Sequence, residues 1–476
     1  MTWETVIGLE THVELATKTK IFCSCTTAFG GAPNTHCCPV CTGMPGTLPV
    51  LNKKVLEFAV KAGLALNCSI TRYSRFDRKN YFYPDLPKAY QISQLYLPIA
   101  RDGAVPIRTD TGDKTIRIHE LHMEEDAGKL VHDPWLEQTR ADYNRCGVPL
   151  IEIVTEPDFR TAGEVIAYLE KLKEMLQYLG VSDCKMQEGS LRCDVNLSVR
   201  PLGSCELGTR TEMKNLNSFK AIARAIGYEA RRQIELIEEG KRVVQETRRW
   251  DENKDASYAM RSKENAQDYR YFPEPDIPPI ELSQKYLDGL RASQPELAEA
   301  KRARYQADYG LPAYDCEMIT SHRALAAFFE ALVELGVPPK QGANWMMGQV
   351  LGALSQRAME PKDMKLTPST LARLISLVGE GRLNRNTAVK VFEAVFDTNG
   401  DVDEYVAAHG LEQVNDSQLV QEICVKVLQA HPQSVSDYRG GKEKAFGFLV
   451  GQVMRALKGK ANPQTVNEAL RKLLDA

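Results

Sequence analysis

The sequence predicts an α+β fold in which an N-terminal domain with an antiparallel sheet precedes an all-α helical domain and an α-helical tail domain. Up to about residue 290, short stretches alternate apolar and polar residues between turns rich in Gly, Pro, Asn and Asp. Residues 272–279 (FPEPDIPP) contain four prolines and indicate an extended exit from that region. Beyond Leu290, apolar residues recur every three to four positions, which is typical of helices.

Length and periodicity indicate three domains. A chain of 476 residues is too long for one compact core, and we expect domains at residues 1–292, 293–408 and 409–476. The tail, from about Leu411, is expected to hold three helices and a glycine-rich turn at residues 439–442. In the second domain, the spacing predicts helices at Pro295–Gly310, Ala324–Leu335, Trp345–Gln356 and Pro368–Val378.

The composition is that of a water-soluble globular protein. Apolar residues make up 43% of the chain and charged residues 26%, and the formal net charge is −3. Any contact with nucleic acid must therefore use a local basic patch. The first ten residues include Glu4 and no long apolar stretch, and the longest apolar segment, near Phe446–Met454, is interrupted by glycine and glutamine. We expect a cytoplasmic protein without membrane contact.

Three predicted strands each carry a row of polar side chains. Alternate residues of a strand point to opposite faces, so residues 7–15, 191–199 and 210–214 each separate an apolar from a polar row. A half-solvated sheet is one interpretation, but the choice of Glu, His, Asp and Asn favours ligands for a hard cation. The polar residues are Glu10, His12 and Glu14, then Arg192, Asp194, Asn196 and Ser198, then Arg210, Glu212 and Lys214.

Two acidic segments could complete a cation site. Residues 122–126 (HMEED) place four ionisable groups in five positions, and Glu152 lies inside the apolar run at residues 149–154 (PLIEIV). An ionised carboxylate in such a run is costly unless it is paired or bound to a metal, and pairing with an arginine is the alternative. Magnesium prefers a few carboxylates together with water and phosphate oxygens, so this set of residues fits Mg²⁺.

Familiar nucleotide and nucleophile motifs are absent from the sequence. It contains no G-x-x-x-x-G-K-[ST] loop, no G-x-G-x-x-G fingerprint and no G-x-S-x-G elbow. A nucleotide would therefore not be held by a glycine loop of those kinds. A helix is predicted to begin at Ser218 and to end near Gly240, and its N-terminus beside Lys214 would suit a phosphate.

Cysteines near the N-terminus have the spacing of metal ligands. The segment Cys23-x-Cys25 is followed, after twelve residues, by Cys38-x-x-Cys41, and nearby prolines and glycines supply tight turns. In a cytoplasmic chain such cysteines are thiols or metal ligands rather than disulfides. The spacing predicts a structural zinc ion in the loop at residues 23–41, with unbound core cysteines as the alternative. His36 and Cys37 are spare candidates.

Two regions interleave or concentrate basic residues. Residues 75–91 (RFDRKNYFYPDLPKAYQ) and 269–272 (YRYF) mix cations with aromatic rings, as unstacked nucleotides require, although aromatic clusters also anchor loops. Residues 437–460 contain six basic and two acidic residues. A phosphate-backbone contact and a solvated helix face are both consistent with that segment. Its basic residues are Arg439, Lys442, Lys444, Arg455, Lys458 and Lys460.

Segments in order along nearly the whole chain resemble one family, the B subunit of the aspartyl/glutamyl-tRNA(Asn/Gln) amidotransferase. The resemblance implies a cradle-like N-terminal α+β domain, a helical domain and a helical tail that holds the tRNA. It also implies a heterotrimer with an amidase subunit, which frees ammonia from glutamine, and a small third subunit. The segments are VIGLETHVEL, FDRKNYFYPDLPKAYQISQ, LHMEEDAGK, PLIEIVTEPD, QEGSLRCDVN, EMKNLNSF, QETRRWDE, DYRYFPEPD and GFLVGQVMRALKGKANP.

The resemblance further implies ATP-dependent transamidation of misacylated Glu-tRNA(Gln) or Asp-tRNA(Asn). The carboxylate would be phosphorylated by ATP, and ammonia would then displace phosphate. His12, Glu125 and Glu152 would hold Mg²⁺ and, with Glu10, form the catalytic set; because Glu124 and Glu125 are adjacent, either could be the ligand. Other implied residues are Glu10, Asp194, Asn196, Glu212 and Lys214 in the ATP and acyl-end pocket, and Lys79 and Tyr81 near the terminal adenosine.

Two other functions remain consistent with parts of the sequence. A non-catalytic, zinc-stabilised RNA-binding subunit would explain the cysteine loop and the basic tail, but would leave the Glu and His rows without a role. An ATP-dependent amide synthetase acting on a free amino acid would explain the cation site, but neither the tail nor the aromatic-basic loop. The glycine- and serine-rich loop of an amidase is absent, and the sequence does not distinguish glutamyl from aspartyl tRNA.

Overall fold

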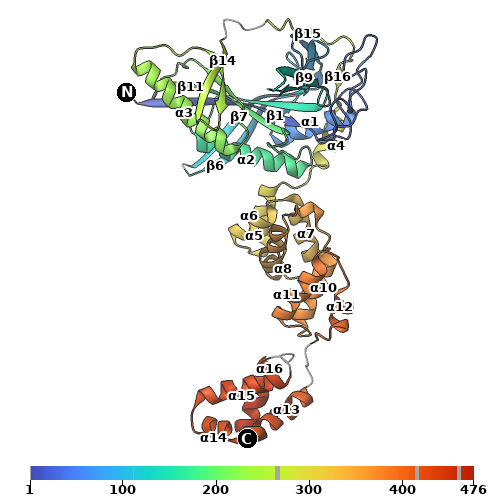
Figure 1. Cartoon of the computed structure of the whole chain (residues 1–476), viewed down its shortest axis with the longest axis vertical. Coiled ribbons are helices and arrows are strands. Elements are labelled where there is room, and N and C mark those ends of the chain that lie inside the picture. The colour runs from blue at the N-terminus through green and yellow to red at the C-terminus, as the bar shows by residue number, and fades with distance from the viewer. Residues whose placement is uncertain are drawn as a thin grey trace. The chain divides into compact units, whose positions relative to one another are not determined.

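The computed structural model describes residues 2–110, 112–133, 135–262, 268–412, 417–457 and 463–475. The chain divides into two compact units, Met1–Leu297 and Ala298–Ala476, which Figure 1 colours from blue to yellow and from yellow to red. The first unit is an α+β structure and the second is helical, so the predicted fold class is confirmed. The first domain boundary predicted from the sequence, after residue 292, falls in the last residues of the first unit.

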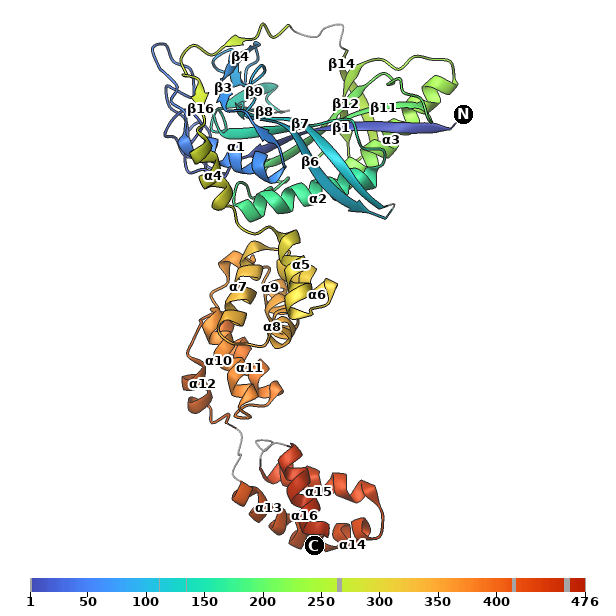
Figure 2. The same cartoon turned by 180° about the vertical axis from the view of Figure 1, so that it is seen from behind.

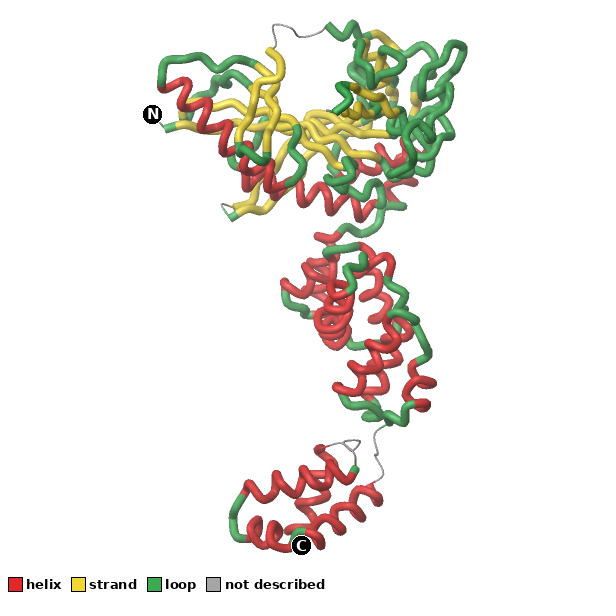
Figure 3. The backbone as a smooth tube through the Cα atoms, viewed as in Figure 1, coloured by secondary structure: helices red, strands yellow, loops and turns green. Residues whose placement is uncertain are grey.

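A nine-stranded sheet forms the centre of the first unit (Figure 3). Its strand order is β14-β13-β12-β11-β1-β10-β7-β6-β2, with β1 in the middle. The alternation predicted for the polar strands is confirmed, because Ile7, Leu9 and Val13 are buried in the core while Glu10 and His12 face the other side. The strands are β1 (Trp3–Glu14), β2 (Ser69–Ile70), β6 (Ala100–Thr109), β7 (Gly112–Glu125), β10 (Pro149–Thr155), β11 (Leu191–Pro201), β12 (Thr211–Lys214), β13 (Glu246–Asp251) and β14 (Ala256–Ser262).

One neighbouring pair in this sheet is parallel, which the prediction of an antiparallel sheet did not include. The strands β12 and β13 run in the same direction, whereas the other neighbouring pairs of the sheet are antiparallel. Parallel neighbours need a crossover connection, usually a helix. Here the helix α3 (Phe219–Glu238) lies between β12 and β13 in the chain and supplies that connection.

Helices cover one face of the sheet and leave the other to the polar rows. The helices α1 (Lys53–Ala65), α2 (Ala162–Leu179) and α3 lie together on this face in both views (Figures 1 and 2). Their apolar sides join the core of the sheet, with Leu172 and Ile222 fully buried. As predicted, α3 begins after Ser218, whose side chain accepts a hydrogen bond from the backbone N–H of Ala221, and Gly240 follows its end.

Three small sheets flank the large one, and one of them corrects the predicted path of the proline-rich segment. Phe272–Pro273 (β15) does not leave the domain but pairs antiparallel with β4 (Asp77–Asn80). Proline has no N–H to donate to a neighbouring strand, so it is tolerated in an edge strand, where no partner is needed on one side. The other elements are β3 (Tyr73–Ser74), β5 (Tyr90–Ser93), β8 (Lys129–Asp133), β9 (Gln138–Asp142), β16 (Ile280–Glu281) and α4 (Gln284–Ala292).

The second unit contains two separate hydrophobic cores. The first draws residues from Tyr305 to Val406 and the second from Val420 to Leu474. The tail holds four described helices rather than the three predicted, because the short α14, in which no residue is buried, carries no apolar pattern. The helices of the unit are α5 (Ala298–Tyr309), α6 (Ala313–Thr320), α7 (Arg323–Glu334), α8 (Pro339–Trp345), α9 (Leu351–Gln356), α10 (Pro368–Gly379), α11 (Arg385–Phe396), α12 (Val402–Ala408), α13 (Ser417–Ala430), α14 (Pro432–Arg439), α15 (Glu443–Ala456) and α16 (Pro463–Asp475).

Two further features of the helices bear on the sequence predictions. The predicted helix at residues 345–356 contains a π-helical turn, Met346–Val350, between α8 and α9. The predicted glycine-rich turn lies between α14 and α15, where Gly441 has a φ of 88°. Among the described residues, no helix is at once long and apolar enough to cross a bilayer.

The packing of α2 on the sheet yields a stability prediction. Phe159 is fully buried, its ring lies 5.3 Å from that of Tyr168 on α2, and its backbone bonds to Ile7 of β1. Phe159→Ala should lower the free energy of unfolding of the first unit by about 3–5 kcal/mol, and Phe159→Leu by less, because leucine leaves a smaller cavity than alanine does. Urea unfolding followed by tryptophan fluorescence measures both; equal losses of stability would contradict the packing argument.

Candidate functional site

The pairing of β1 with its two neighbours brings the predicted polar rows together. His12 lies directly opposite Glu152 of β10, and Glu10 lies opposite Asp194 of β11. On the next strand, Glu212 of β12 lies opposite Asn196 of β11. These side chains point away from the face that carries the helices, and each is partly exposed. The polar face of the sheet therefore collects several carboxylates and the imidazole of His12 at its centre.

The first cluster on this face consists of His12, Glu124 and Glu152. One ligand atom from each lies within 4.8 Å of the others. His12 Nε2 is 3.5 Å from a Glu124 oxygen and 3.6 Å from a Glu152 oxygen. Burial disfavours the charge on Glu152, but electrostatic interaction with His12 and His122 and a hydrogen bond from His122 outweigh it and lower the pKa of Glu152 below its ordinary value. Two carboxylates and one imidazole so placed can hold a divalent cation.

The structure brings Glu124 to this cluster and not Glu125, which corrects the ligand set implied by the family resemblance. Adjacent residues of β7 point to opposite faces. The carboxylate of Glu125 therefore lies on the other side, where it pairs with the ammonium group of Lys88 and accepts a hydrogen bond of 2.9 Å from the backbone N–H of Ile92. Of the two glutamates between which the sequence left the choice open, Glu124 is the one that lies with His12 and Glu152.

His122 holds Glu152 in place, a role that the sequence analysis missed. Its Nε2 lies 2.9 Å from a Glu152 oxygen, and its Nδ1 lies 3.4 Å from Glu120. Burial opposes a charge on this ring, but Glu152, Glu120 and Glu124 raise the pKa of His122 well above its ordinary value. The two-residue spacing of Glu120, His122 and Glu124 in β7 was the available signal, because it places all three on one strand face.

A second carboxylate cluster lies beside the first. Glu10, Asp194 and Glu212 also place one oxygen each within 4.8 Å of the others. The ammonium group of Lys214 pairs with Asp194 and lies 2.8 Å from Glu212, while Asn196 donates a hydrogen bond of 2.9 Å to Glu10. Burial, together with the charges of Glu152 and Glu212, raises the pKa of Glu10. All five residues predicted for the ATP and acyl-end pocket therefore lie in this one cluster.

Lys79 and three tyrosines lie near the first cluster. The Nζ atom of Lys79 is 4.8 Å from the ring centroid of Tyr269 and 5.9 Å from that of Tyr81. The rings of Tyr81 and Tyr269, and of Tyr269 and Tyr271, meet edge to face. The charge of Lys79 contributes to the lowered pKa of Glu152. Burial, and then Glu124, raise the pKa of Tyr271. The predicted aromatic-basic segments thus border the cation cluster.

Other members of the polar rows do not join these clusters. The guanidinium group of Arg192 donates a hydrogen bond of 2.7 Å to Asp126, which also lies 3.4 Å from Arg145. Burial and the charge of Asp126 raise the pKa of the neighbouring Glu14 to about 7. These residues form a network of charged groups at the end of β1. For them, the alternative interpretation of the polar rows, in which they are structural and not ligands, holds.

A hollow of about 180 Å³ opens next to the second cluster. Glu10 and Asn196 line both the hollow and that cluster, and Gly8, which has no side chain, also lines the hollow. Val6, Val154, Pro157 and Leu207 supply apolar walls, and Ser198 and Arg210 supply polar edges. The hollow can receive a flat, mostly apolar group attached to a ligand of the carboxylate cluster.

The four predicted zinc ligands lie together. The sulfur atoms of Cys23, Cys25, Cys38 and Cys41 are within 4.8 Å of one another. Lys20 is fully buried, and its Nζ atom lies 3.6 Å from the Cys41 sulfur. Hydrogen bonding from Cys23, with the charge of Lys20 contributing, lowers the pKa of Cys41 to about 4. Four converging sulfurs fit a closed tetrahedral zinc site. The spare candidates, His36 and Cys37, stand outside this group of four.

The basic residues predicted for tRNA binding lie in the tail helices or next to them. Arg439 donates a hydrogen bond of 3.3 Å to the carbonyl of Leu474, and Lys442 pairs with Asp437 at 3.1 Å. Lys444 and Arg455 of α15 are exposed. Lys458 and Lys460 lie outside the residues that the structure describes.

Comparison with protein families places the chain among the tRNA-dependent amidotransferases. Residues 5–288 match the model of the GatB/GatE catalytic domain, and residues 327–474 match that of the GatB domain. The class of protein is thus an amidotransferase subunit, an enzyme component of the ligase type, as predicted.

Similarity to individual proteins shows which amidotransferase subunit family the chain belongs to. The chain is 62% identical over 472 residues to the aspartyl/glutamyl-tRNA(Asn/Gln) amidotransferase B subunit of Lachnoclostridium phytofermentans, with 99% of each chain covered. It is 59% identical to that of Agathobacter rectalis, again with 99% of each covered, and 58% identical to that of Caldicellulosiruptor saccharolyticus, with 100% of each covered. The chain belongs to the family of aspartyl/glutamyl-tRNA amidotransferase B subunits.

The cysteine geometry predicts a metal content. We expect about one zinc ion per purified chain and loss of that zinc in Cys38→Ser and Cys41→Ser, because three thiolates bind a structural zinc much more weakly than four. Cys205→Ser, at an exposed cysteine outside the cluster, is the matched control and should keep its zinc. Elemental analysis by plasma mass spectrometry measures all four proteins; unchanged zinc in Cys38→Ser would exclude the site.

Proposed function

We propose that this chain carries out the ATP-dependent step in the conversion of Glu-tRNA(Gln) or Asp-tRNA(Asn) to its amide. It transfers the γ-phosphoryl group of ATP to the side-chain carboxylate, and ammonia from a partner subunit then displaces phosphate. The observation that carries the proposal is the pair of adjacent carboxylate clusters, His12–Glu124–Glu152 and Glu10–Asp194–Glu212, on one open sheet face. The names of the relatives support the choice of substrates.

The chemistry explains why such a site is needed. Ammonia cannot expel an oxide ion from a carboxylate, so the acid must first gain a better leaving group. Attack of the carboxylate oxygen on the γ-phosphorus releases ADP and forms an acyl phosphate. Attack of ammonia on the acyl carbon then expels inorganic phosphate and yields the amide and a proton. Positioning and neutralisation of charge dominate catalysis of phosphoryl transfer.

The two clusters have different roles in neutralising the charge of the phosphates. His12, Glu124 and Glu152 would hold one Mg²⁺, and the carboxylates of the second cluster face the space beside it. Bound Mg²⁺ would neutralise charge on the phosphate oxygens. The ammonium group of Lys214, held by Asp194 and Glu212, supplies a fixed positive charge for the transferred group. The hollow over Gly8, which adjoins Glu10 and Asn196, would take the adenine base.

The remaining features fit a tRNA ligand. The ammonium group of Lys79 lies over the rings of Tyr81 and Tyr269, so this corner offers a charge and ring faces to the unpaired end of the acceptor strand. The exposed Lys444 and Arg455 of the tail would contact the phosphate backbone elsewhere on the same molecule. The partners in this proposal are an amidase subunit and a small third subunit, assembled in the cytoplasm as a heterotrimer.

A single assay separates this function from its alternatives. The chain, supplied with Glu-tRNA(Gln), ATP, Mg²⁺ and an ammonium salt, should form Gln-tRNA(Gln). A non-catalytic RNA-binding subunit would give no product, and an amide synthetase would use free glutamate equally well. The same assay with Asp-tRNA(Asn) determines which tRNA is preferred. With glutamine in place of ammonium, product should appear only when the amidase subunit is present.

The first cluster generates a prediction about catalysis. In the assembled complex, His12→Ala and Glu124→Gln should lower the rate of ATP-dependent amidation by about 10²- to 10³-fold or more, because each removes a ligand of the cation that stabilises the transferring charge. The Kd for tRNA should stay within about threefold, since neither residue belongs to the RNA contacts. Glu156→Gln, at a surface residue paired with His119, is the control. Loss of tRNA binding in His12→Ala would instead assign that histidine a structural role.

The tail generates a prediction about salt dependence. Removal of residues 413–476 should weaken tRNA binding and flatten the dependence of log Kd on log salt concentration. The double variant Lys444→Ala/Arg455→Ala should reduce that slope by about one for each phosphate that the tail no longer neutralises. Fluorescence anisotropy with labelled tRNA, at several potassium chloride concentrations, gives the slopes. A shortened chain with unchanged affinity would show that the tail does not contact the RNA.

A further inference from the structure

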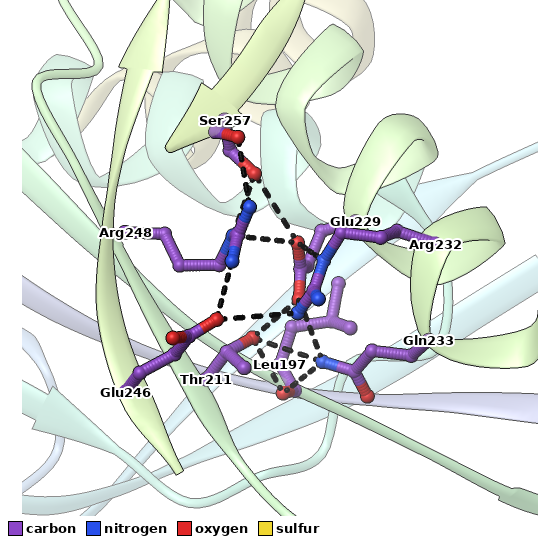
Figure 4. Close-up of polar contacts among 8 residues, drawn as sticks. All are labelled: Leu197, Thr211, Glu229, Arg232, Gln233, Glu246, Arg248 and Ser257. Carbon is purple, nitrogen blue, oxygen red and sulfur yellow. Dashed lines mark hydrogen bonds and ion pairs between the residues drawn. The ribbon is translucent and has the colours of Figure 1, made fainter. Parts of the chain in front are cut away.

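A buried polar network joins α3 to four strands on the face of the sheet opposite the site (Figure 4). Glu229 and Gln233, one helical turn apart on α3, are both fully buried. Around them lie side chains from β12, β13 and β14 and a backbone carbonyl from β11. The members besides these two are Leu197, Thr211, Arg232, Glu246, Arg248 and Ser257.

The carboxylate of Glu229 is the centre of this network. Its Oε1 accepts hydrogen bonds from Thr211 (2.8 Å), Arg232 (2.6 Å) and Gln233 (3.0 Å). Its Oε2 accepts one from Arg232 (2.8 Å) and lies 3.5 Å from Arg248 Nε. Burial disfavours ionisation, but the hydrogen bonds from Arg232 and Gln233 lower the pKa of Glu229, so the group is a carboxylate at neutral pH.

Three strand contacts of the network lie one residue away from a residue of the site face. The carbonyl of Leu197 accepts a hydrogen bond of 3.2 Å from Gln233, and Leu197 follows Asn196. Thr211 is held by Glu229 and precedes Glu212. Arg248 lies beside Glu229 and follows Thr247.

Those three site-face neighbours form one row across the sheet. Asn196 lies opposite Glu212, and Glu212 lies opposite Thr247 in the parallel pair. Thr247 donates a hydrogen bond of 2.7 Å to Glu212. The network therefore supports the row Asn196–Glu212–Thr247 from the opposite face of the sheet.

The position of β12 needs such support. The strand has only four residues. In addition, the negative charges of Glu10, Asp194 and Glu212 lie within 4.8 Å of one another, and their repulsion pushes β12 away from β11 and β1. Hydrogen bonds to a buried carboxylate have defined directions, so the network can set the register of these strands as well as hold the layers together. A displacement of about 1 Å in a phosphoryl-transfer site can cost about 10²-fold in rate.

We propose that Glu229 is a positioning residue for phosphoryl transfer, which acts through Thr211 and Arg248 to hold Glu212 and Lys214 against Asp194 and Glu10. This inference rests on the proposed function. It assigns a catalytic effect to a residue on the far side of the sheet that cannot touch the substrate.

The test compares variants of this subunit in the assembled amidotransferase. Glu229→Gln keeps the shape and removes the charge, Thr211→Val keeps the shape and removes the hydroxyl, and Thr211→Ser restores the hydroxyl. Glu235→Gln, on an exposed position of the same helix, is the control. Phosphate release from ATP with misacylated tRNA gives kcat and KM, fluorescence anisotropy gives the Kd for tRNA, and thermal unfolding shows that each variant is folded at the assay temperature.

We expect kcat to fall about 10- to 100-fold in Glu229→Gln and Thr211→Val. The KM for tRNA should stay within about twofold, and Thr211→Ser and Glu235→Gln should behave as the unaltered complex does. If Glu229→Gln does not fold, the kcat of Thr211→Val alone tests the inference. Folded variants with an unchanged kcat, beside an active unaltered complex, would overturn this inference alone. An unaltered complex that releases no phosphate would overturn the proposed function, and this inference with it.

Discussion

The hydrogen-bonded register of β1 between β10 and β11 is the constraint on which the site depends. Because β1 is paired on both sides, its register determines that His12 lies opposite Glu152 and Glu10 opposite Asp194. A shift of one residue would turn the polar row into the core and the apolar row to the surface. The core residues Ile7, Leu9 and Val13 prevent that shift. The same apolar packing that stabilises the fold therefore also sets which carboxylates can share a cation.

Gathering carboxylates on one face costs free energy, and the surrounding residues offset it. Lys214 lies between Asp194 and Glu212, and the charged imidazole of His122 lies against Glu152. Part of the repulsion remains, because the charges of Glu152 and Glu212 add to the effect of burial in raising the pKa of Glu10. Under the proposed function a bound divalent cation would relieve the remainder, which would link ligand binding to the stability of this face. The electrostatics of this face therefore favour a positively charged ligand.

Alternation in single strands made much of the site predictable, whereas contacts between strands did not follow from the sequence. The two-residue period placed Glu10, His12, Asp194 and Glu212 on a common kind of face before any pairing was known. The choice of Glu124 over Glu125 required the register of β7 against β10, and the partner of Glu125, Lys88, comes from a separate loop. The parallel pair and the fourth tail helix were missed for a similar reason, since neither leaves a local apolar pattern.

The single parallel pair has a consequence for the order in which the active centre forms. An antiparallel hairpin can close locally, but β12 and β13 cannot meet until the 31 residues between Lys214 and Glu246 have folded back across the sheet. The helix α3 is the main part of that segment, and it brings Glu229 with it. Because synthesis proceeds from the N-terminus, His12 and Glu152 emerge before β13 does, and they can meet before Thr247 reaches Glu212. The support of Glu212 by β13 would then be completed late in folding, once α3 has packed onto the sheet.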